Sequence, residues 1–252
     1  NLANLKYNPA MDHQKQETVL RGGRVIDPES GFDQTADVLI EDGLVTAIET
    51  TPGKISSKIT SENTLVLNVE GCLVTPGLID PHVHLREPSI NQLHTETIAT
   101  GSRGAVCGGF TTVCCMPNTS PALDCLDVLA LVQQQSKKAL AAGGSRVFAV
   151  VCATLGRKGH EQVNFQALAE AGAVGFSDDG DAVARDDVMA LVLKNVKDVD
   201  SVFMQHCQDP AMTVGSVMNT SPTATRLGLI GWPPVAESSI LERDLKLNAA
   251  IG

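Results

Sequence analysis

Hydrophobic positions follow two different patterns along this chain, and the change falls near residue 72. Before it, short apolar runs are separated by Gly-Gly, Asp-Pro and Asp-Gly pairs, which are typical of turns. Asp42-Gly43 lies between two of these runs and predicts a hairpin. The predicted strands are residues 19–20, 24–26, 36–40, 44–48 and 65–68. We therefore expect a small all-β part over residues 18–72, preceded by a polar, disordered leader at residues 1–17.

From residue 73 the pattern becomes a strand followed by a helix, repeated along the chain. The predicted strands are residues 73–79, 111–116, 146–153, 173–177 and 201–205. The predicted helices are residues 95–107, 126–142, 163–171, 187–196 and 235–251. The acidic pair Asp186-Asp187 is expected to cap the fourth helix. This alternation predicts an α/β fold with a parallel sheet and helices outside it, and both an open doubly wound sheet and a barrel fit it.

The positions of the candidate functional residues favour the barrel, because each of them follows a predicted strand. Active sites of (β/α)8 barrels are built at this end of the strands. Five strands cannot close an eight-stranded barrel. We therefore expect residues 73–252 to form a partial TIM-type barrel of the (β/α)8 kind, truncated after about five β/α units.

Length and charge narrow the function without identifying it. The chain of 252 residues has 19 Lys and Arg against 29 Asp and Glu, a formal net charge of −10, which argues against a nucleic-acid partner. A small anionic substrate needs only local positive charge and is compatible with this balance. No apolar run reaches the ~20 residues that span a bilayer, and residues 1–16 lack the apolar segment of a signal peptide. We expect a cytoplasmic protein with no membrane partner.

Cysteine usage supports the same compartment. The seven cysteines are Cys72, Cys107, Cys114, Cys115, Cys125, Cys152 and Cys207. Their number is odd, no Cys-x-x-Cys occurs, and most lie in apolar segments. We predict that they are reduced and buried as small hydrophobic residues. Cys207 adjoins His206, but neighbours on a strand point to opposite faces, so we predict a structural role for it.

His82 and His84 directly follow the first strand of the second part, which we expect to end at Asp80-Pro81 because proline lacks an N–H to donate. Residues two apart on an extended backbone point to the same side. Two imidazoles on one side of a strand end suit a metal ion. Arg86 follows on that side, and its planar guanidinium suits a carboxylate. The alternative interpretation is that one or both histidines bind no ligand.

Further candidates follow later strands. Asp178 and Asp179 are adjacent where a strand becomes a loop, so only one of them can point into the site. A carboxylate can bridge two metal ions, but an Asp-Gly turn with a helix-capping role explains the pair equally well. His206 ends an apolar run and is either a ligand or a buried, hydrogen-bonded histidine. Asn118 is either a rim residue that binds substrate or a turn residue after Pro117.

Three stretches carry a family resemblance: VTPGLIDPHVHLREP at residues 74–88, GGFTTVCCMPNTSP at 108–121 and GAVGFSDDG at 172–180. They resemble, in the same order, signature motifs of the cyclic amidohydrolases, and of the dihydroorotase family most closely. The resemblance extends from about Thr18 onward. It implies zinc-dependent, reversible cyclisation of N-carbamoyl-L-aspartate to dihydroorotate in pyrimidine biosynthesis. It also implies that the N-terminal strands belong to a small β-sandwich part completed by strands that come later in full-length relatives.

The resemblance also implies residue roles. The implied metal ligands are His82, His84, Asp179 and His206, holding two Zn²⁺ ions. The implied substrate-binding residues are His84, Arg86 and Asn118. Asp179 and a hydroxide are expected to bridge the two ions. The general acid/base aspartate and one further histidine ligand are expected beyond Gly252, so we expect no catalytic residue within this chain and impaired activity in a fragment that ends there.

Two other functions remain open at this point. One is a non-catalytic dihydroorotase-like subunit that scaffolds aspartate carbamoyltransferase, although a scaffold has no need of metal ligands. The other is a related hydantoinase or allantoinase, whose families carry a carboxylated lysine where this chain has Asp179. The implied partners are the small-molecule substrate and either a second copy of the chain or aspartate carbamoyltransferase.

Overall fold

A computed structural model describes residues 17–59, 64–89 and 94–252. The chain divides into two compact units, Asn1–Pro76 and Gly77–Gly252, and each is described here by itself. The leader predicted at residues 1–17 lies outside the described residues except for Glu17. That residue already belongs to the first strand, where its side chain is buried and accepts a hydrogen bond from the hydroxyl of Thr64.

Unit 1 contains a five-stranded sheet. Its strands are β1 (Glu17–Asp27), β2 (Phe32–Glu41), β3 (Leu44–Glu49), β4 (Leu65–Asn68) and β5 (Leu73–Val74). They lie in the order β3-β2-β1-β4, with β5 also paired to β1. The predicted strands at 19–20 and 24–26 are one strand, because a bulge between Leu20 and Gly23, with Gly22 at φ +77°, lets the ladder continue. The predicted hairpin is confirmed, since Asp42 (φ 51°) and Gly43 (φ 81°) join β2 to β3.

Alternation along these strands gives the sheet two apolar clusters. Val19 and Leu39 pack with Ile55 of the 3₁₀ helix η2 (Lys54–Lys58). Val25, Ala36 and Val38 form the other cluster. Among the described residues the strands make a single sheet, so the second layer of a sandwich stays a prediction.

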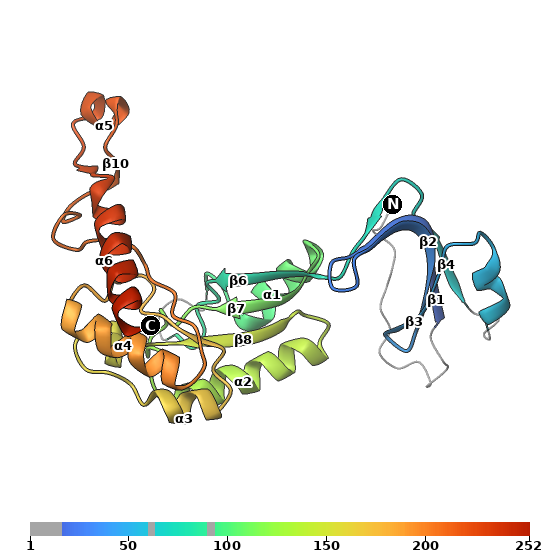
Figure 1. Cartoon of the computed structure of the whole chain (residues 1–252), viewed down its shortest axis with the longest axis horizontal. Coiled ribbons are helices and arrows are strands. Elements are labelled where there is room, and N and C mark those ends of the chain that lie inside the picture. The colour runs from blue at the N-terminus through green and yellow to red at the C-terminus, as the bar shows by residue number, and fades with distance from the viewer. Residues whose placement is uncertain (1–16, 60–63, 90–93) are drawn as a thin grey trace. The chain divides into compact units, whose positions relative to one another are not determined.

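Unit 2 contains a four-stranded parallel sheet in the order β6-β7-β8-β9, with helices between the strands (Figure 1). The strands are β6 (Leu78–Val83), β7 (Phe110–Cys115), β8 (Arg146–Val151) and β9 (Gly175–Phe176). The helices are α1 (Ile98–Cys107), α2 (Leu126–Ala141), α3 (Phe165–Glu170), α4 (Asp186–Asp198), α5 (Pro222–Leu227) and α6 (Val235–Ile251). The core lies between the sheet and its helices and includes Val113, Leu129, Val151, Leu168, Phe176 and Met189. The predicted alternation of strand and helix in a parallel sheet is therefore confirmed.

The first strand of this part differs from the prediction. Its predicted range is divided between β5 of unit 1 and β6, and β6 continues through Pro81 to Val83. Proline is tolerated because β6 is at the edge of the described sheet and its register with β7 shifts between Asp80 and Val83. The strand is also not buried, since Leu78 is 49% and Ile79 is 66% exposed.

The predicted fifth strand at 201–205 was wrong. Phe203 makes only an isolated bridge to Phe176, so the described sheet has four strands rather than five. The sequence pattern also did not predict α5 or the two-residue strands β10 (Met218–Asn219) and β11 (Gly231–Trp232), which are too short for periodicity to detect. In Figure 1 this segment projects beyond the start of α6.

Two local predictions are also corrected. The N-cap of α4 is Arg185, while the acidic pair Asp186-Asp187 lies inside its first turn. Cys72, Cys107 and Cys125 are exposed rather than buried, because they lie at or beyond the ends of elements. By contrast, burial raises the pKa of the Cys115 thiol to about 12, as expected for an inert core thiol.

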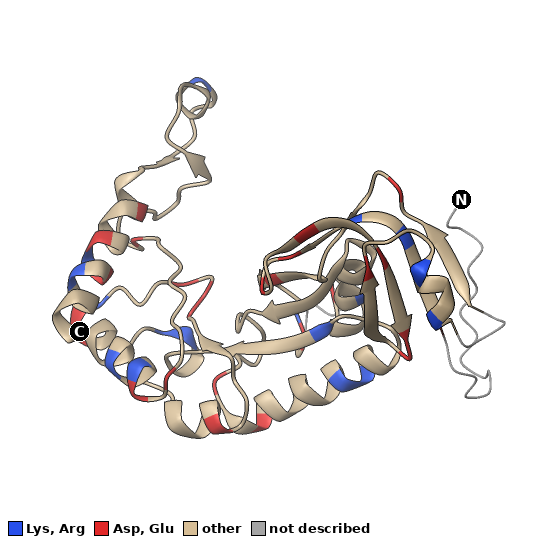
Figure 2. Ribbon diagram, turned by 45° about the vertical axis from the view of Figure 1, so that its right-hand side comes forward, with Lys and Arg blue, Asp and Glu red and all other residues tan. Residues whose placement is uncertain are grey.

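Charged residues of both signs are distributed over the helices of unit 2 (Figure 2). In α2, Asp127 lies in the first turn and Lys138 in the last, the arrangement that the helix dipole favours. No helix within the described ranges is long and apolar enough to cross a bilayer.

Candidate metal centre

Three imidazoles lie around one carboxylate in unit 2. His82 lies in β6 and His84 directly follows it, while Asp179 follows β9. The distances to Asp179 Oδ1 are 3.5 Å from His82 Nε2 and 3.2 Å from His206 Nδ1. His84 Nε2 lies 3.5 Å from the other oxygen, Oδ2. Parallel strands end at one edge of the sheet, which explains how residues almost 100 positions apart in sequence converge.

This donor set fits a divalent metal ion. One ligand atom from each of His82, His84 and Asp179 lies within 4.8 Å of the other two. Imidazole nitrogen and carboxylate oxygen together suit zinc and other first-row metals. Asp179 is only 4% exposed, and burying a carboxylate is costly unless cationic or hydrogen-bonding partners compensate for the lost solvent. His206 reaches the same carboxylate but lies outside that compact group of three.

The electrostatics keep Asp179 ionised. Burial acts to raise its pKa, but the hydrogen bond with His206 and the charges of the three imidazoles outweigh burial and lower the pKa. The reciprocal effect raises the pKa of His206, mainly through its hydrogen bond to Asp179. An ionised carboxylate is the form that a metal ion requires.

Asp178 points away from this cluster, as side-chain alternation predicts for one of two adjacent residues. Its Oδ1 accepts hydrogen bonds from the backbone N–H of Ala153 (2.9 Å) and Thr154 (3.0 Å), and its Oδ2 accepts one from the Thr154 hydroxyl. Burial raises the pKa of Asp178 in spite of these hydrogen bonds. Asp178 therefore links the loop after β9 to the loop after β8 by hydrogen bonds. Of the two adjacent aspartates, Asp179 is the one that faces the imidazoles.

Asn118 and Arg86 lie beside the cluster. Asn118 Oδ1 is 2.9 Å from His84 Nδ1, and its Nδ2 is 3.5 Å from Asp179 Oδ2. Arg86 Nη1 donates to the backbone carbonyl of Asn118 at 3.4 Å. When the amide oxygen accepts from Nδ1–H, the Nε2 lone pair of His84 is free for a metal ion. Asn118 therefore orients His84, a role that the sequence did not predict.

Sequence reasoning also missed Thr154 and Arg157 in the loop after β8. Arg157 Nη1 donates to the backbone carbonyl of Asp179 at 2.7 Å and pairs with Asp181 Oδ2 at 2.9 Å. The available signal was their position directly after a predicted strand, but threonine and arginine are too common in loops for position alone to select them.

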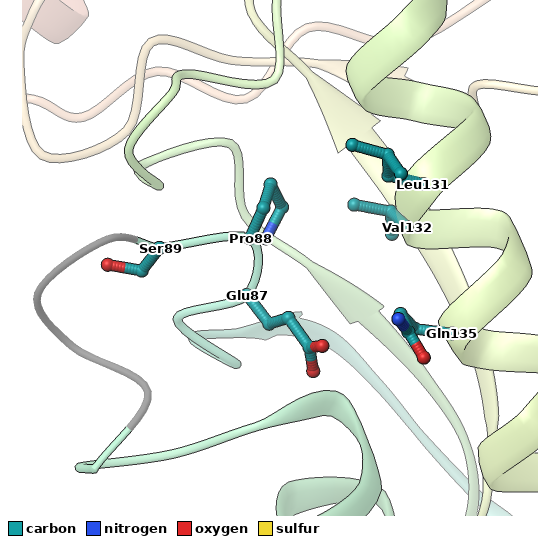
Figure 3. Close-up of a pocket in the computed structure, with 6 residues that line it drawn as sticks. All are labelled: Glu87, Pro88, Ser89, Leu131, Val132 and Gln135. Atoms are coloured by element: carbon teal, nitrogen blue, oxygen red, sulfur yellow. The ribbon is translucent and has the colours of Figure 1, made fainter.

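A pocket of about 170 Å³ lies between the chain that follows β6 and α2 (Figure 3). It is lined by Glu87, Pro88, Ser89, Leu131, Val132 and Gln135. Glu87 is already engaged, since its Oε2 accepts the N–H of Ile98 at the start of α1 at 2.8 Å. The lining includes neither the three histidines nor Asp179, so this pocket is separate from the cluster.

The chain has relatives in sequence and in fold. Over 234 residues it is 41% identical to "Dihydroorotase" of Geobacter sp. (strain M21), covering 93% of this chain and 52% of that protein. Over 234 residues it is 39% identical to "Dihydroorotase" of Syntrophobacter fumaroxidans (strain DSM 10017 / MPOB), with the same coverage. The chain thus spans about half the length of these relatives.

Solved structures share the fold at lower identity. The L-hydantoinase (dihydropyrimidinase) of Arthrobacter aurescens superposes with a TM-score of 0.68 at 19% identity, over 95% of this chain and 51% of that one. The D-hydantoinase (dihydropyrimidinase) of Thermus sp. does so with a TM-score of 0.61 at 22% identity, over 93% and 50%. Residues 71–252 match the family described as "Dihydro-orotase-like". This chain belongs to the dihydro-orotase-like family.

Proposed function

We propose that this chain is part of a zinc-dependent dihydroorotase that interconverts N-carbamoyl-L-aspartate and dihydroorotate. The observation that carries the proposal is the group formed by His82, His84 and Asp179 in a chain 37–41% identical to proteins named dihydroorotase. The hydantoinases share only the fold at this identity. An aspartate at position 179 also favours dihydroorotase over relatives that use a carboxylated lysine.

The architecture supports the same proposal. We propose that β6 to β9 are the first strands of a (β/α)8 barrel, whose active site lies at the carboxyl ends of the strands. His82, His84 and Asp179 lie at those ends in the described sheet, and His206 reaches Asp179 from the segment that follows the isolated bridge at Phe203.

The proposed roles divide between holding metal and holding substrate. His82, His84, Asp179 and His206 would hold two zinc ions, with Asp179 between them. Bound zinc supplies a Lewis acid that polarises a carbonyl and lowers the pKa of water. Asp179 contributes a carboxylate that stays ionised, and Asn118 orients His84 through Nδ1.

Substrate recognition is assigned to Arg86, Asn118 and His84. The Arg86 guanidinium is half-buried beside Asn118 and offers a fork of donors to the carboxylate that substrate and product share. The side-chain amide of Asn118 would donate to the substrate through Nδ2, because its Oδ1 is hydrogen-bonded to His84. The partner predicted from the resemblance, a second copy of the chain or aspartate carbamoyltransferase, stays a prediction.

The test is a substrate panel on purified, zinc-loaded protein, assayed as this chain and as the longest natural polypeptide that contains it. We expect turnover of dihydroorotate, and slower or no turnover of hydantoin and allantoin. Turnover of hydantoin with none of dihydroorotate would contradict the proposal. Full zinc occupancy without any turnover in the longer polypeptide would instead favour a non-catalytic scaffold.

A further inference from the structure

We infer that Thr154 and Arg157, two residues of the loop after β8, are positioning residues for the carboxylate of Asp179. The inference rests on the proposed function of Asp179 as a metal ligand. Within the described ranges, neither residue is hydrogen-bonded to one of the three imidazoles; their side-chain partners are Asp178, Gly159, Asp179 and Asp181. Each acts through the short segment from Ser177 to Asp181 that carries Asp179.

Thr154 acts through Asp178. Both residues are fully buried, and Thr154 donates both its backbone N–H and its hydroxyl to the Asp178 carboxylate. The same hydroxyl oxygen accepts the N–H of Gly159 at 2.9 Å, which fixes the rotamer of Thr154. Because Asp178 and Asp179 are consecutive and point in opposite directions, holding one carboxylate sets the backbone from which the other projects.

Arg157 acts on the other side of Asp179. Its guanidinium donates to the Asp179 carbonyl and pairs with Asp181, so one side chain ties down the peptide after Asp179. The N–H of Asp179 donates to Ser177 Oγ at 2.9 Å. Both backbone polar groups of Asp179 are therefore hydrogen-bonded. We call the supporting contacts of Thr154, Arg157 and Ser177 the frame, and they fix the direction in which the Asp179 carboxylate points.

This support matters because most contacts of the Asp179 carboxylate are long. Within the described chain it has a hydrogen bond with His206 at 3.2 Å, while His82, His84 and Asn118 each lie 3.5 Å from it. A metal site requires each ligand to be held within about 0.5 Å of its binding position, and residues that contact the ligand but not the metal provide this support. We therefore expect loss of the frame to weaken metal binding rather than stability alone.

Ser145 provides a matched control at the opposite end of β8. Ser145 is 1% exposed, and its hydroxyl lies 2.9 Å from the carbonyl of Ser102 and 2.6 Å from that of Phe110. Ser145→Ala and Thr154→Val each remove one buried hydroxyl at one end of the same strand. A purely structural role for Thr154 predicts that the two variants behave alike.

The experiment measures zinc affinity by competition with a chromophoric chelator, the visible spectrum of the cobalt-loaded protein, and thermal unfolding of the metal-free protein. We expect Thr154→Val to weaken zinc binding roughly 10- to 100-fold and to change the cobalt spectrum. Thr154→Ser keeps the hydroxyl and should restore both. Ser145→Ala should lower the unfolding temperature and leave affinity and spectrum unchanged.

Arg157→Met keeps the inference testable if Thr154→Val does not fold, because Arg157 is partly exposed and its loss leaves the core intact. We expect weaker zinc binding in this variant as well. Wild-type affinity in both Thr154→Val and Arg157→Met overturns the inference while leaving the proposed function standing. Equal losses in Ser145→Ala and Thr154→Val overturn it too, and wild-type protein that binds no zinc overturns both proposals.

Discussion

The two ends of the four-stranded sheet in unit 2 bury polar groups of different kinds. At the amino ends, the neutral hydroxyl of Ser145 lies within hydrogen-bond distance of two backbone carbonyls and shares its one hydrogen between them. At the carboxyl ends, two adjacent carboxylates, Asp178 and Asp179, are 0% and 4% exposed. Among the described residues of this sheet, the buried carboxylates lie at the carboxyl ends.

A contribution to stability explains the buried hydroxyl at the amino ends, but it does not explain the buried carboxylates at the carboxyl ends. A neutral buried hydrogen bond contributes about 1 kcal/mol, whereas a buried charge costs several kcal/mol before its partners compensate. Replacing a buried ion pair by apolar side chains of similar volume is often neutral or stabilising. We infer that the carboxyl ends are organised for binding, so variants at the two ends should separate effects on binding from effects on stability.

The largest effect is expected at Asp179. Asp179→Ala removes the carboxylate that faces all three imidazoles. Loss of a residue that only supports a ligand lowers metal affinity up to roughly 100-fold, so loss of the ligand itself should lower zinc affinity by more. Zinc per chain after dialysis measures it. Asp187→Ala, which removes an exposed carboxylate from α4, is the control. If Asp178→Ala loses metal and Asp179→Ala does not, our assignment of the two side chains is reversed.

The histidines come next. His82→Ala and His84→Ala should each lose zinc and activity together, because each removes one of the three clustered ligand atoms. His160→Ala is the matched control, since His160 is exposed and lies outside the cluster. Full zinc occupancy in either cluster variant would remove that histidine from the ligand set.

A smaller and different effect is expected at Arg86. Arg86→Lys keeps the charge but loses the fork, and a charge-assisted hydrogen bond is worth about 1.5–3 kcal/mol, so KM for dihydroorotate should rise roughly tenfold or more. Zinc affinity should not change. Arg103→Lys, at an exposed position of α1, controls for the substitution itself. An unchanged KM would mean that Arg86 does not meet substrate.

The mildest variants are at two glycines, one at each end of the sheet. A Cβ at Gly77, at the amino end of β6, would lie 2.2 Å from Thr111 Oγ1, so Gly77→Ala should cost about 1–3 kcal/mol of stability. A Cβ at Gly180 would lie 2.8 Å from Arg157 Nη1 and 3.3 Å from Asn118 Nδ2, at φ +89°. Gly180→Ala should cost similar stability.

Zinc affinity separates these two variants. We expect a modest loss for Gly180→Ala, because the new methyl group displaces side chains that contact Asp179 and His84. Gly77→Ala should bind zinc as the wild type does. Zinc titrations of both variants, together with their unfolding curves, measure this difference. Loss of zinc affinity in Gly77→Ala as well would contradict the proposed division between the two ends of the sheet.

Much of the fold could be predicted from local pattern. The order of strands and helices, the hairpin at Asp42-Gly43 and the opposite directions of Asp178 and Asp179 all follow from periods of a few residues. The errors fall where packing overrides pattern. Strand β6 continues through Pro81 because an edge position and a register shift permit it, and residues 201–205 are apolar but form only one bridge.

Side-chain alternation and turn chemistry are properties of neighbouring residues, so the sequence alone could predict which residues carry candidate chemistry and that Asp179 follows a strand. Only the tertiary structure decided which of them meet. The contact of Asn118 with His84 spans 34 residues, and that of Thr154 with Asp178 spans 24. Such contacts depend on which strands lie side by side, and residues far apart in sequence set that order by packing into one core.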